Sequence, residues 1–463
     1  MIPMMSFSSR VFALLMLCAL WHGAAARSLA TAGCPMFHCT AGATGIESQP
    51  LIPAVLASNV NDSLGTLVRQ GCSGNATTLT CLYSIDKAKG VARGTLKQLN
   101  ATTLQANWGS AGKARSYNLD AATAADGQVP VNFSNGTIAA GDANYEVLYN
   151  ASGVVLGKVA LDGVGKNLGL TPLSDTFGVV SQSDGFLTLI NLGTWTAAGT
   201  LTLNDPTDAA PVILVSVSVG ASNVLYSIGY DSADNIGVLY SIGLTVRTQQ
   251  LAVRSTFTFT GSSGACPVVV SPSQSGLPGN LVLLAAPGLI GDQQPQNRLI
   301  ALTDSGALAE SWSLPLSFGM TVSPTVDQGT QSLFYQDSSG PNVYQNSLID
   351  GAPIQTFNMQ SIGGFPGTFV LNGHLGASQA GSVFTLLLSG ESTTSEPTTA
   401  EYVLAFQPVA MPNALVWSNE ISTARVNYTA AWNFAPSSVA GTACPIAITA
   451  AGISSSIVRL CDH

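Results

Sequence analysis

The sequence has few charged side chains. Asp, Glu, Lys and Arg together make up 9% of its 463 residues, and the formal net charge is −9. Runs of Lys or Arg do not occur. Nucleic acids and anionic membrane surfaces attract proteins through clustered basic residues, so neither is an expected partner. Glu/Lys-rich helical stretches are also missing. Gly, Ser, Thr, Val, Leu and Ala dominate instead, which favours strands and tight turns.

Long hydrophobic runs are missing as well. A membrane-spanning helix needs about 18–20 consecutive apolar residues, and the nearest candidate, residues 280–291, is broken by a proline. The N-terminus has a shorter apolar run, Val11–Trp21, which follows Arg10 and precedes the small residues Ala24–Ala26. This order is typical of a secretory signal peptide, which we predict to span residues 1–26. The mature chain is therefore expected to be soluble, secreted and extracellular.

Histidine is scarce. Outside the predicted signal peptide the histidines are His38, His374 and His463, and the sequence contains no GxSxG motif. A Ser-His-Asp system needs a histidine beside its nucleophile. His374 follows a glycine in an expected turn, where a solvated loop histidine is the simplest interpretation. We therefore predict no catalytic residue, although the sequence leaves open whether the chain is an enzyme.

The cysteines lack metal-binding spacing: CxxC does not occur, so a zinc site is not expected. An exported chain permits disulfides instead. Cys72 and Cys81 flank a turn-rich loop that suits a local bridge, and Cys266 is then the odd cysteine, which we expect to be a buried apolar side chain. Because the N-terminal cysteines alone allow several pairings, the connectivity stays open. The disulfide candidates are the near pairs Cys34 and Cys39, Cys72 and Cys81, and Cys444 and Cys461.

Carboxylates are sparse, and turn formation explains most of them, because an aspartate side chain caps its own backbone in a turn. Asp231, Asp234 and Asn235 lie close together in the sequence and offer the oxygen ligands that a hard cation prefers. Their spacing does not match a calcium loop, so we predict no metal site. The aspartates expected at corresponding turns are Asp142, Asp184, Asp304 and Asp337.

Asn-x-Ser/Thr sequons are concentrated in the N-terminal part of the chain. In a secretory route they are acceptors for N-linked glycans. A Ser/Thr-rich chain also produces several by chance, so both interpretations stay open. The glycosylation candidates are Asn61, Asn75, Asn100, Asn132, Asn135, Asn150 and Asn427.

A repeat of about 40 residues runs through the chain. Each unit begins with a proline before an apolar run, and proline is tolerated at the start of a strand because no ladder hydrogen bond is lost there. A strand, a turn and another strand follow, as in "RLIALTDSGALAESW", "TLKQLNATTLQANW" and "EYVLAFQPVAMPNALVW", which end at Trp312, Trp108 and Trp417. About four strands per unit is the pattern of a β-propeller blade. The proline-led starts are Pro130, Pro172, Pro211, Pro267, Pro324, Pro366 and Pro445.

The unit at Met320–Gly351 shows why the repeats must pack together. Two turn signals, at residues 327–329 and 337–341, separate three short apolar runs. Two or three strands are not stable alone. We therefore expect this unit to pack against its neighbours in sequence on both sides, as blades do in a propeller.

These patterns predict an all-β chain with a β-propeller of about seven four-stranded blades, or alternatively eight. We expect a signal peptide at residues 1–26, a cysteine-bearing cap at 27–78 and the propeller at 79–463. One blade is predicted to join the chain ends, with an inner strand at Pro445–Thr449 and outer strands within Leu79–Trp108, because ring closure removes free sheet edges. The Ser/Thr-rich stretch Gly390–Glu401 is expected to form a protruding loop.

The proline-led strand and the LxALxxxxGxxxxW-like strand pair resemble the PQQ-like repeats of quinoprotein dehydrogenase-like β-propellers, from about Leu79 onward. That resemblance implies either a pyrroloquinoline-quinone dehydrogenase or a scaffolding propeller without cofactor. The dehydrogenases use adjacent cysteines and a Glu/Asn/Asp calcium set, and neither is recognisable here. We therefore predict no cofactor. Trp108, Trp312 and Trp417 occupy the repeat's tryptophan position and are expected to pack between blades.

Two functions remain. The leading hypothesis is a secreted, non-catalytic β-propeller that binds an extracellular protein or glycan as an interaction or scaffold module. The alternative is a secreted oxidoreductase or carbohydrate-active hydrolase or lyase that uses the central funnel. Ionisable side chains that converge on the funnel would favour the enzyme.

Overall fold

The protein is seen in a computed structural model that describes most of the chain from residue 130 onward and parts of the segment before it. The residues described are 46–47, 56–62, 66–75, 77–85, 93–108, 116–117, 130–142, 144–263, 265–292, 296–320, 322–337, 339–380, 383–395, 398–408, 415–422, 428–436, 443–451 and 454–460.

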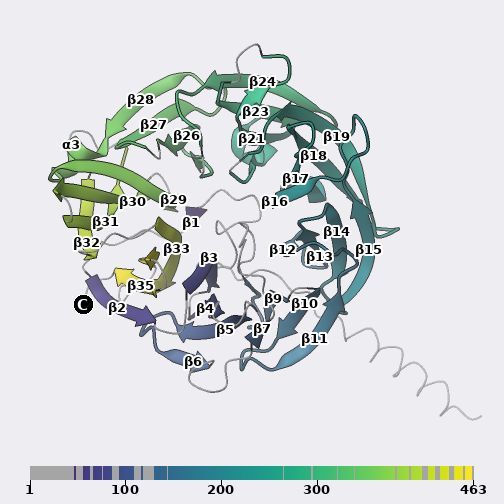
Figure 1. The fold of residues 1–463 in the computed structure, drawn as a ribbon, viewed down its shortest axis with the longest axis horizontal. Coiled ribbons are helices and arrows are strands. Elements are labelled where there is room, and N and C mark those ends of the chain that lie inside the picture. The colour runs from purple at the N-terminus through teal and green to yellow at the C-terminus, as the bar shows by residue number, and fades with distance from the viewer. Residues whose placement is uncertain are drawn as a thin grey trace, which may run out of the picture.

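The chain is an all-β propeller, as predicted, whose sheets stand around a central axis (Figure 1). In the described part of the chain, seven four-stranded blades are each built from one stretch of chain, and an eighth sheet joins segments near the two ends of the chain. Blades 1 to 7 are numbered here in chain order, and the eighth sheet is called the closing blade. Among the described residues, no helix is long and apolar enough to cross a membrane.

The strands follow each other from the inner to the outer edge of each blade. Blades 1 and 2 contain β3 (Thr66–Gly74), β4 (Thr78–Ile85), β5 (Arg93–Asn100) and β6 (Ala106–Trp108), then β8 (Val131–Asn132), β9 (Ile138–Asp142), β10 (Tyr145–Tyr149) and β11 (Val155–Ala160). Blades 3 and 4 contain β12 (Asn167–Pro172), β13 (Phe177–Gln182), β14 (Phe186–Asn191) and β15 (Thr196–Thr202), then β16 (Ile213–Val219), β17 (Val224–Asp231), β18 (Ile236–Thr245) and β19 (Gln250–Thr260).

Blades 5 to 7 have the same strand order, and a few short elements lie outside the four-stranded pattern. Blades 5 and 6 contain β20 (Val268–Val270), β21 (Asn280–Ala286), β23 (Arg298–Asp304) and β24 (Leu308–Pro315), then β25 (Thr325–Asp327), β26 (Ser332–Gln336), β27 (Asn342–Ser347) and β28 (Pro353–Asn358). Blade 7 contains β29 (Thr368–Ala380), β30 (Val383–Ser395), β31 (Thr398–Phe406) and β32 (Leu415–Ser422). The short extra elements are β1 (Ile46–Glu47), β7 (Ser116–Tyr117), β22 (Gly288–Leu289), η3 (Ala221–Asn223), α2 (Pro272–Ser275) and α3 (Met359–Gly363).

The unit at Met320–Gly351 packs as predicted. Its strand β26 is buried along its whole length. Leu333 and Tyr335 belong to a core shared with blade 5, whereas Phe334 belongs to a core shared with blade 7. Because successive side chains of a strand point to opposite faces, one strand supplies both interfaces. The unit is therefore stabilised by its neighbours on both sides.

The proline signal located most inner strands. Pro130, Pro267 and Pro324 directly precede β8, β20 and β25, and Pro211 and Pro366 lie two residues before β16 and β29. Pro172 and Pro445 are exceptions, because they lie at the end of β12 and inside β34 (Ala443–Ala451). Pro445 therefore does not begin an inner strand.

The closing blade differs from the prediction. Its order is β33 (Tyr428–Pro436), β34, β35 (Ser454–Leu460) and β2 (Leu56–Asp62), so the N-terminal partner is β2 and not the segment Leu79–Trp108. That segment belongs to blade 1 together with β3. Sheet pairing thus extends the propeller into residues 56–74, which were predicted as part of a cap. In Figure 1 β2 lies on the outside of β35, near the C-terminus.

The stretch Gly390–Glu401 also differs from expectation. Strands β30 and β31 continue through it, and their last matched pair is Ser395 and Thr398. The predicted loop is therefore mostly an extended hairpin, because regular pairing satisfies the backbone groups of these Ser/Thr-rich strands.

The strand order also fixes the two rims of the ring. Neighbouring strands within a blade are antiparallel, so connections alternate between the two ends of the blade. The first rim carries the connections between strands one and two and between strands three and four. The second rim carries those between strands two and three and those from one blade to the next.

Candidate functional site

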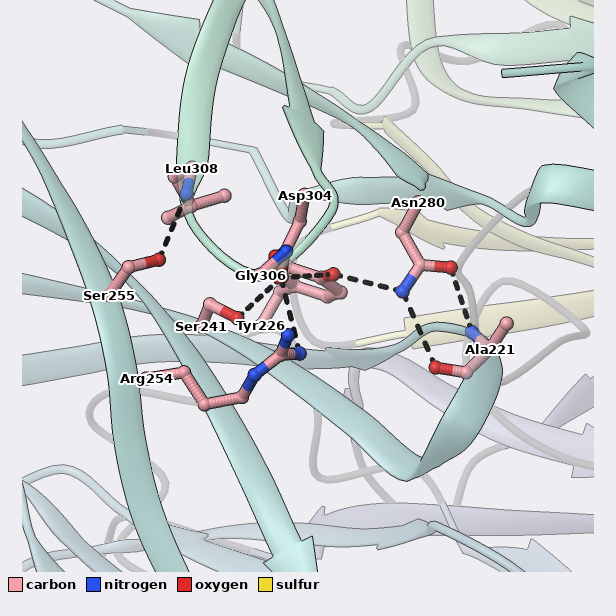
Figure 2. A network of polar contacts seen from close by, with 9 residues as sticks. All are labelled: Ala221, Tyr226, Ser241, Arg254, Ser255, Asn280, Asp304, Gly306 and Leu308. Atoms are coloured by element: carbon pink, nitrogen blue, oxygen red, sulfur yellow. Dashed lines mark hydrogen bonds and ion pairs between the residues drawn. The ribbon is translucent and has the colours of Figure 1, made fainter. Parts of the chain in front are cut away.

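The most extensive polar network in the described part of the chain lies on the first rim, between blades 4 and 5 (Figure 2). Blade 4 supplies Tyr226 from β17, Ser241 from β18 and Arg254 from β19. Blade 5 supplies Asn280, the first residue of β21, and Asp304, the last residue of β23. The network therefore joins side chains that lie far apart in the sequence.

The Asp304 carboxylate is the centre of this network. Its Oδ2 accepts hydrogen bonds from the Ser241 hydroxyl at 2.5 Å and the Tyr226 hydroxyl at 2.8 Å. Its Oδ1 accepts the backbone N–H of Gly306 at 2.9 Å. A guanidinium nitrogen of Arg254 lies 3.5 Å from Oδ2. Both carboxylate oxygens are thus bound by the protein's own groups.

Asn280 extends the network to the connection between β16 and β17 of blade 4. Its amide nitrogen donates to the Tyr226 hydroxyl at 3.0 Å, and its Oδ1 accepts the backbone N–H of Ala221 at 2.9 Å. Elsewhere at the same interface, the backbone N–H of Leu308 donates to the Ser255 hydroxyl at 3.0 Å. The two blades are therefore linked at several points on this rim.

The environment keeps the carboxylate charged. Burial alone raises the pKa of Asp304, but hydrogen bonds from Ser241, Gly306 and Tyr226, with the charge of Arg254, outweigh it and hold the pKa below its usual value. Burial, and secondarily Asp304, raise the pKa of Tyr226, although the bond from Asn280 opposes this shift. An ionised carboxylate with occupied oxygens is a poor general base. The network is suited to joining blades.

The second rim has a different character. Its connections carry most of the solvent-reaching carboxylates described here, and Arg298 pairs with one of them at 3.5 Å. Lys166 is the basic residue within the described parts of these connections, and Arg298 is the first residue of the strand that follows one of them. The described first-rim connections carry two carboxylates, Asp175 and Asp350. The carboxylates that reach solvent on the second rim are Asp162, Asp184, Asp208, Asp234, Asp292 and Asp337. We call this surface the acidic rim.

One connection of the acidic rim holds an apolar side chain out into solvent. Val164, between blades 2 and 3, is 95% exposed. The Asp184 carboxylate accepts the backbone N–H groups of Val164 and Gly165, each at 2.7 Å. The Gln182 side chain accepts the N–H of Gly163 at 3.0 Å and donates to its carbonyl at 2.9 Å. This loop is therefore held in one conformation before any partner arrives.

The predicted turn aspartates are not all equivalent. Asp142, Asp184 and Asp337 lie at or just after the ends of the second strands of blades 2, 3 and 6, so they do share a position. Asp304 ends a third strand instead, on the opposite rim. His374, expected in a turn, lies within β29, where the register shifts between Asn372 and Gly376. His38 and His463 lie outside the described residues.

The cysteine predictions are partly tested. Cys72 and Cys81 form the expected disulfide, which joins paired positions of β3 and β4. Cys444 is disulfide-bonded as well. Cys266 is buried, as expected. The other candidates, Cys34, Cys39 and Cys461, lie outside the described residues.

The asparagine side chains of the sequons differ in their exposure and in their hydrogen bonds. Asn135 is exposed, and its Oδ1 accepts the backbone and hydroxyl of Thr137. Asn132 is 1% exposed, and its amide nitrogen donates to the Ser73 hydroxyl at 2.7 Å. A glycan on that nitrogen would have to displace this contact, so the fold disfavours glycosylation there. Asn75, Asn100 and Asn150 are half-buried, the side chain of Asn61 in β2 is not described, and Asn427 lies outside the described residues.

Comparisons with known proteins concern the fold. A europium-containing methanol dehydrogenase is similar, with a TM-score of 0.57, 8% identity and coverage of 93% of this chain and 98% of that one. BamB from Moraxella catarrhalis has a TM-score of 0.44 and 12% identity, with coverage of 88% of this chain and 99% of that one. Sqt1 from Saccharomyces cerevisiae has a TM-score of 0.44 and 10% identity, with coverage of 71% of this chain and 93% of that one. No family model and no curated protein matches the sequence. The first of these likenesses confirms the predicted fold, a β-propeller.

Proposed function

We propose that the chain is a secreted, non-catalytic β-propeller that binds a basic surface of an extracellular protein through its acidic rim. The observation that carries this proposal is the unequal charge of the two rims. Among the described residues, carboxylates that reach solvent gather on the second rim, and the first-rim connections carry two. A surface of one sign raises the rate of encounter with a partner of the opposite sign. Glycans rarely carry positive charge, so a protein is the preferred ligand class.

The loop around Val164 supports a binding role. An apolar side chain that is fully exposed on a rigid loop contributes contact area at little cost in conformational entropy. Apolar contacts at the centre of an interface and charged groups at its edge are the usual division of labour in protein recognition. The acidic rim offers both kinds of group.

Disulfide bonding supports the proposal that the chain is exported. The Cys72–Cys81 disulfide and the bonded Cys444 are typical of proteins that fold in an oxidising compartment. Together with the signal-like residues 1–26, they favour secretion over a cytosolic location.

The enzyme alternative rests on the likeness to a dehydrogenase, which at 8% identity extends to the fold alone. A catalytic site would need acid, base or nucleophilic groups that converge with spare hydrogen-bonding capacity. Asp304 is the best-connected carboxylate described here, and its oxygens are already bound. The observations therefore favour binding.

The test is a pair of charge-matched variants. Full-length protein secreted from a eukaryotic host would be screened on arrays of extracellular proteins and glycans at low and physiological salt. The double variant Asp162→Asn/Asp234→Asn removes two exposed charges from the acidic rim. The control Asp175→Asn/Asp350→Asn removes two exposed charges from the first rim.

We expect captured proteins to have basic surfaces and to associate several-fold more slowly with the acidic-rim variant, with the control unchanged. Equal effects of both variants, or capture that ignores salt, would contradict the proposal. Reproducible turnover of an oxidisable alcohol or a glycoside by the purified protein would favour the enzyme instead.

A further inference from the structure

Three aspartates meet on the acidic rim between blades 3 and 4. Asp205 and Asp208 lie in the connection from β15 to β16, and Asp231 is the last residue of β17. One carboxylate oxygen from each lies within 4.8 Å of the others. The blade-to-blade connection and the turn after a second strand lie at the same end of a blade, which is why the fold brings these residues together.

Two of the three carboxylates are buried, and in each only one of the two oxygens has a hydrogen-bond partner among the described residues. Asp205 is 1% exposed and Asp231 is 3% exposed. The Oδ1 of Asp205 accepts the N–H of Thr207 at 2.7 Å, and the Oδ1 of Asp231 accepts the N–H of Ala233 at 2.7 Å. The Oδ2 atom of each is buried without any hydrogen-bond partner among the described residues. Each carboxylate thus keeps one oxygen available for a ligand.

Among the described residues, no Lys or Arg side chain forms an ion pair with this cluster. The ion pairs described are Arg254 with Asp304 and Arg298 with Asp292. The neighbouring Tyr240 donates its hydroxyl to the Asn204 carbonyl at 3.0 Å, and not to a carboxylate. Burial, with the negative charges of Asp205 and Asp231, raises the pKa of Tyr240. Buried like charges are costly unless a counter-charge is bound.

We propose that Asp205, Asp208 and Asp231 form a calcium-binding site. Calcium takes oxygen ligands at about 2.3–2.6 Å, so oxygens on opposite sides of one ion are separated by roughly 5 Å. The separations in the cluster fit within that span. Magnesium binds at about 2.0–2.1 Å and demands a stricter octahedron, which favours calcium here. Asp208 is exposed, so the ion has a path to solvent and room for water ligands.

The site joins an inter-blade loop to the following blade. Bound calcium would offset most of the cluster's negative charge and fix residues 205–208 against the end of β17. The sequence pattern around Asp231 pointed to Asp234 and Asn235 as partners. The Asn235 side chain instead accepts the Tyr230 hydroxyl at 3.0 Å, and the actual neighbours come from the preceding inter-blade connection. A local motif search cannot find such a site.

The test uses the full secreted chain after chelator treatment. Titration calorimetry with CaCl2, and thermal unfolding with and without millimolar CaCl2, would be compared with MgCl2. We expect one calcium ion per chain and a higher melting temperature with calcium, because a ligand that binds the native state stabilises it. Asp205→Asn and Asp231→Asn each keep the Oδ1 acceptor of their turn and remove the charge. Each should weaken calcium binding roughly tenfold or more and reduce the calcium-dependent melting shift.

The matched control is Asp337→Asn. Asp337 directly follows a second strand, close to the position of Asp231 at the end of its own second strand. The Oδ1 of Asp337 accepts the Ser339 N–H at 2.9 Å, but Asp337 lies outside the cluster. This variant should bind calcium like the parent. The proposal is overturned if the parent gives neither binding heat nor a melting shift with CaCl2. It is equally overturned if Asp205→Asn and Asp231→Asn bind calcium as tightly as Asp337→Asn.

Discussion

Trp312 and Gly351 show at the scale of single residues how adjacent blades are joined. The Trp312 indole N–H donates to the Leu348 carbonyl of the next blade at 3.2 Å, and its ring lies against Gly351. The Trp108 indole does the same at the interface between blades 1 and 2, with the Ala151 carbonyl at 2.9 Å and with Gly153. The sequence predicted that these tryptophans pack between blades. Their glycine partners could not be predicted, because only the fold shows which turn meets each ring.

Gly351→Ala tests this contact. A Cβ on Gly351 would lie 2.7 Å from Cε3 of Trp312, and its φ is +71°. The left-handed backbone costs about 1–2 kcal/mol for alanine, and the clash adds about 1–3 kcal/mol. Gly276→Ala is the matched control, because Gly276 has φ +72° and open space around its Cβ position. Denaturant unfolding should show a larger decrease in the free energy of unfolding for Gly351→Ala than for Gly276→Ala. Equal losses would mean that the ring contact contributes nothing.

Asp304 gives a pH-dependent prediction. Its pKa is lower in the folded chain than the usual value, so its contribution to stability is present above the ordinary carboxyl range and is lost as the pH falls through the folded pKa. Asp304→Asn should lower the free energy of unfolding by about 1.5–3 kcal/mol at neutral pH. The difference in unfolding free energy between parent and variant should narrow below about pH 4.

Denaturant unfolding at a series of pH values measures this gap. Asp175→Asn, an exposed carboxylate on the same rim, is the control and should change stability little at any pH. A gap for Asp304→Asn that stays constant down to low pH would show that the carboxylate's charge does not stabilise the interface.

At the scale of elements, the pairing of β2 with β35 closes the ring. Val60 is opposite Ile457, and β35 in turn pairs with β34. The repeat pattern correctly predicted strands, blades and a closure that joins the chain ends. It assigned the wrong N-terminal strand, because β2 is the outermost strand of its sheet, whereas the proline signal marks inner strands, and because it lies in a segment whose cysteines suggested a separate cap. Strands that pair across about four hundred residues leave no local sequence signal.

Two N-terminal truncations test the closure. One version of the mature chain would begin at Pro53 and keep β2, and the other would begin at Gly65 and lose it. Both lose the same preceding residues, so their difference isolates the strand. Losing β2 exposes the edge of β35, and an open edge pairs with other chains. We expect the shorter protein to aggregate or fail to be secreted. If both versions are secreted as monomers with the same melting temperature, β2 does not close the ring.

At the scale of the whole molecule, the two rims carry different kinds of polar groups. The first rim holds the saturated network around Asp304, which joins blades 4 and 5. The second rim holds the exposed carboxylates, the Val164 loop and the cluster of Asp205, Asp208 and Asp231. Composition predicted a net negative charge but not its distribution. That distribution depends on which end of a blade each connection occupies, which follows from strand order and not from local sequence.

The most direct test of the binding face is a hydrogen-exchange footprint of the full chain with a basic extracellular protein captured from the array. We predict slower exchange in the second-rim connections at residues 161–166, 203–212 and 232–235, because a docked partner excludes water from their backbone amides. The first-rim connections at residues 173–176 and 348–352 should exchange as in the protein alone. Protection confined to those first-rim connections, or to the outer strands of the blades, would contradict the assignment of the acidic rim as the binding face.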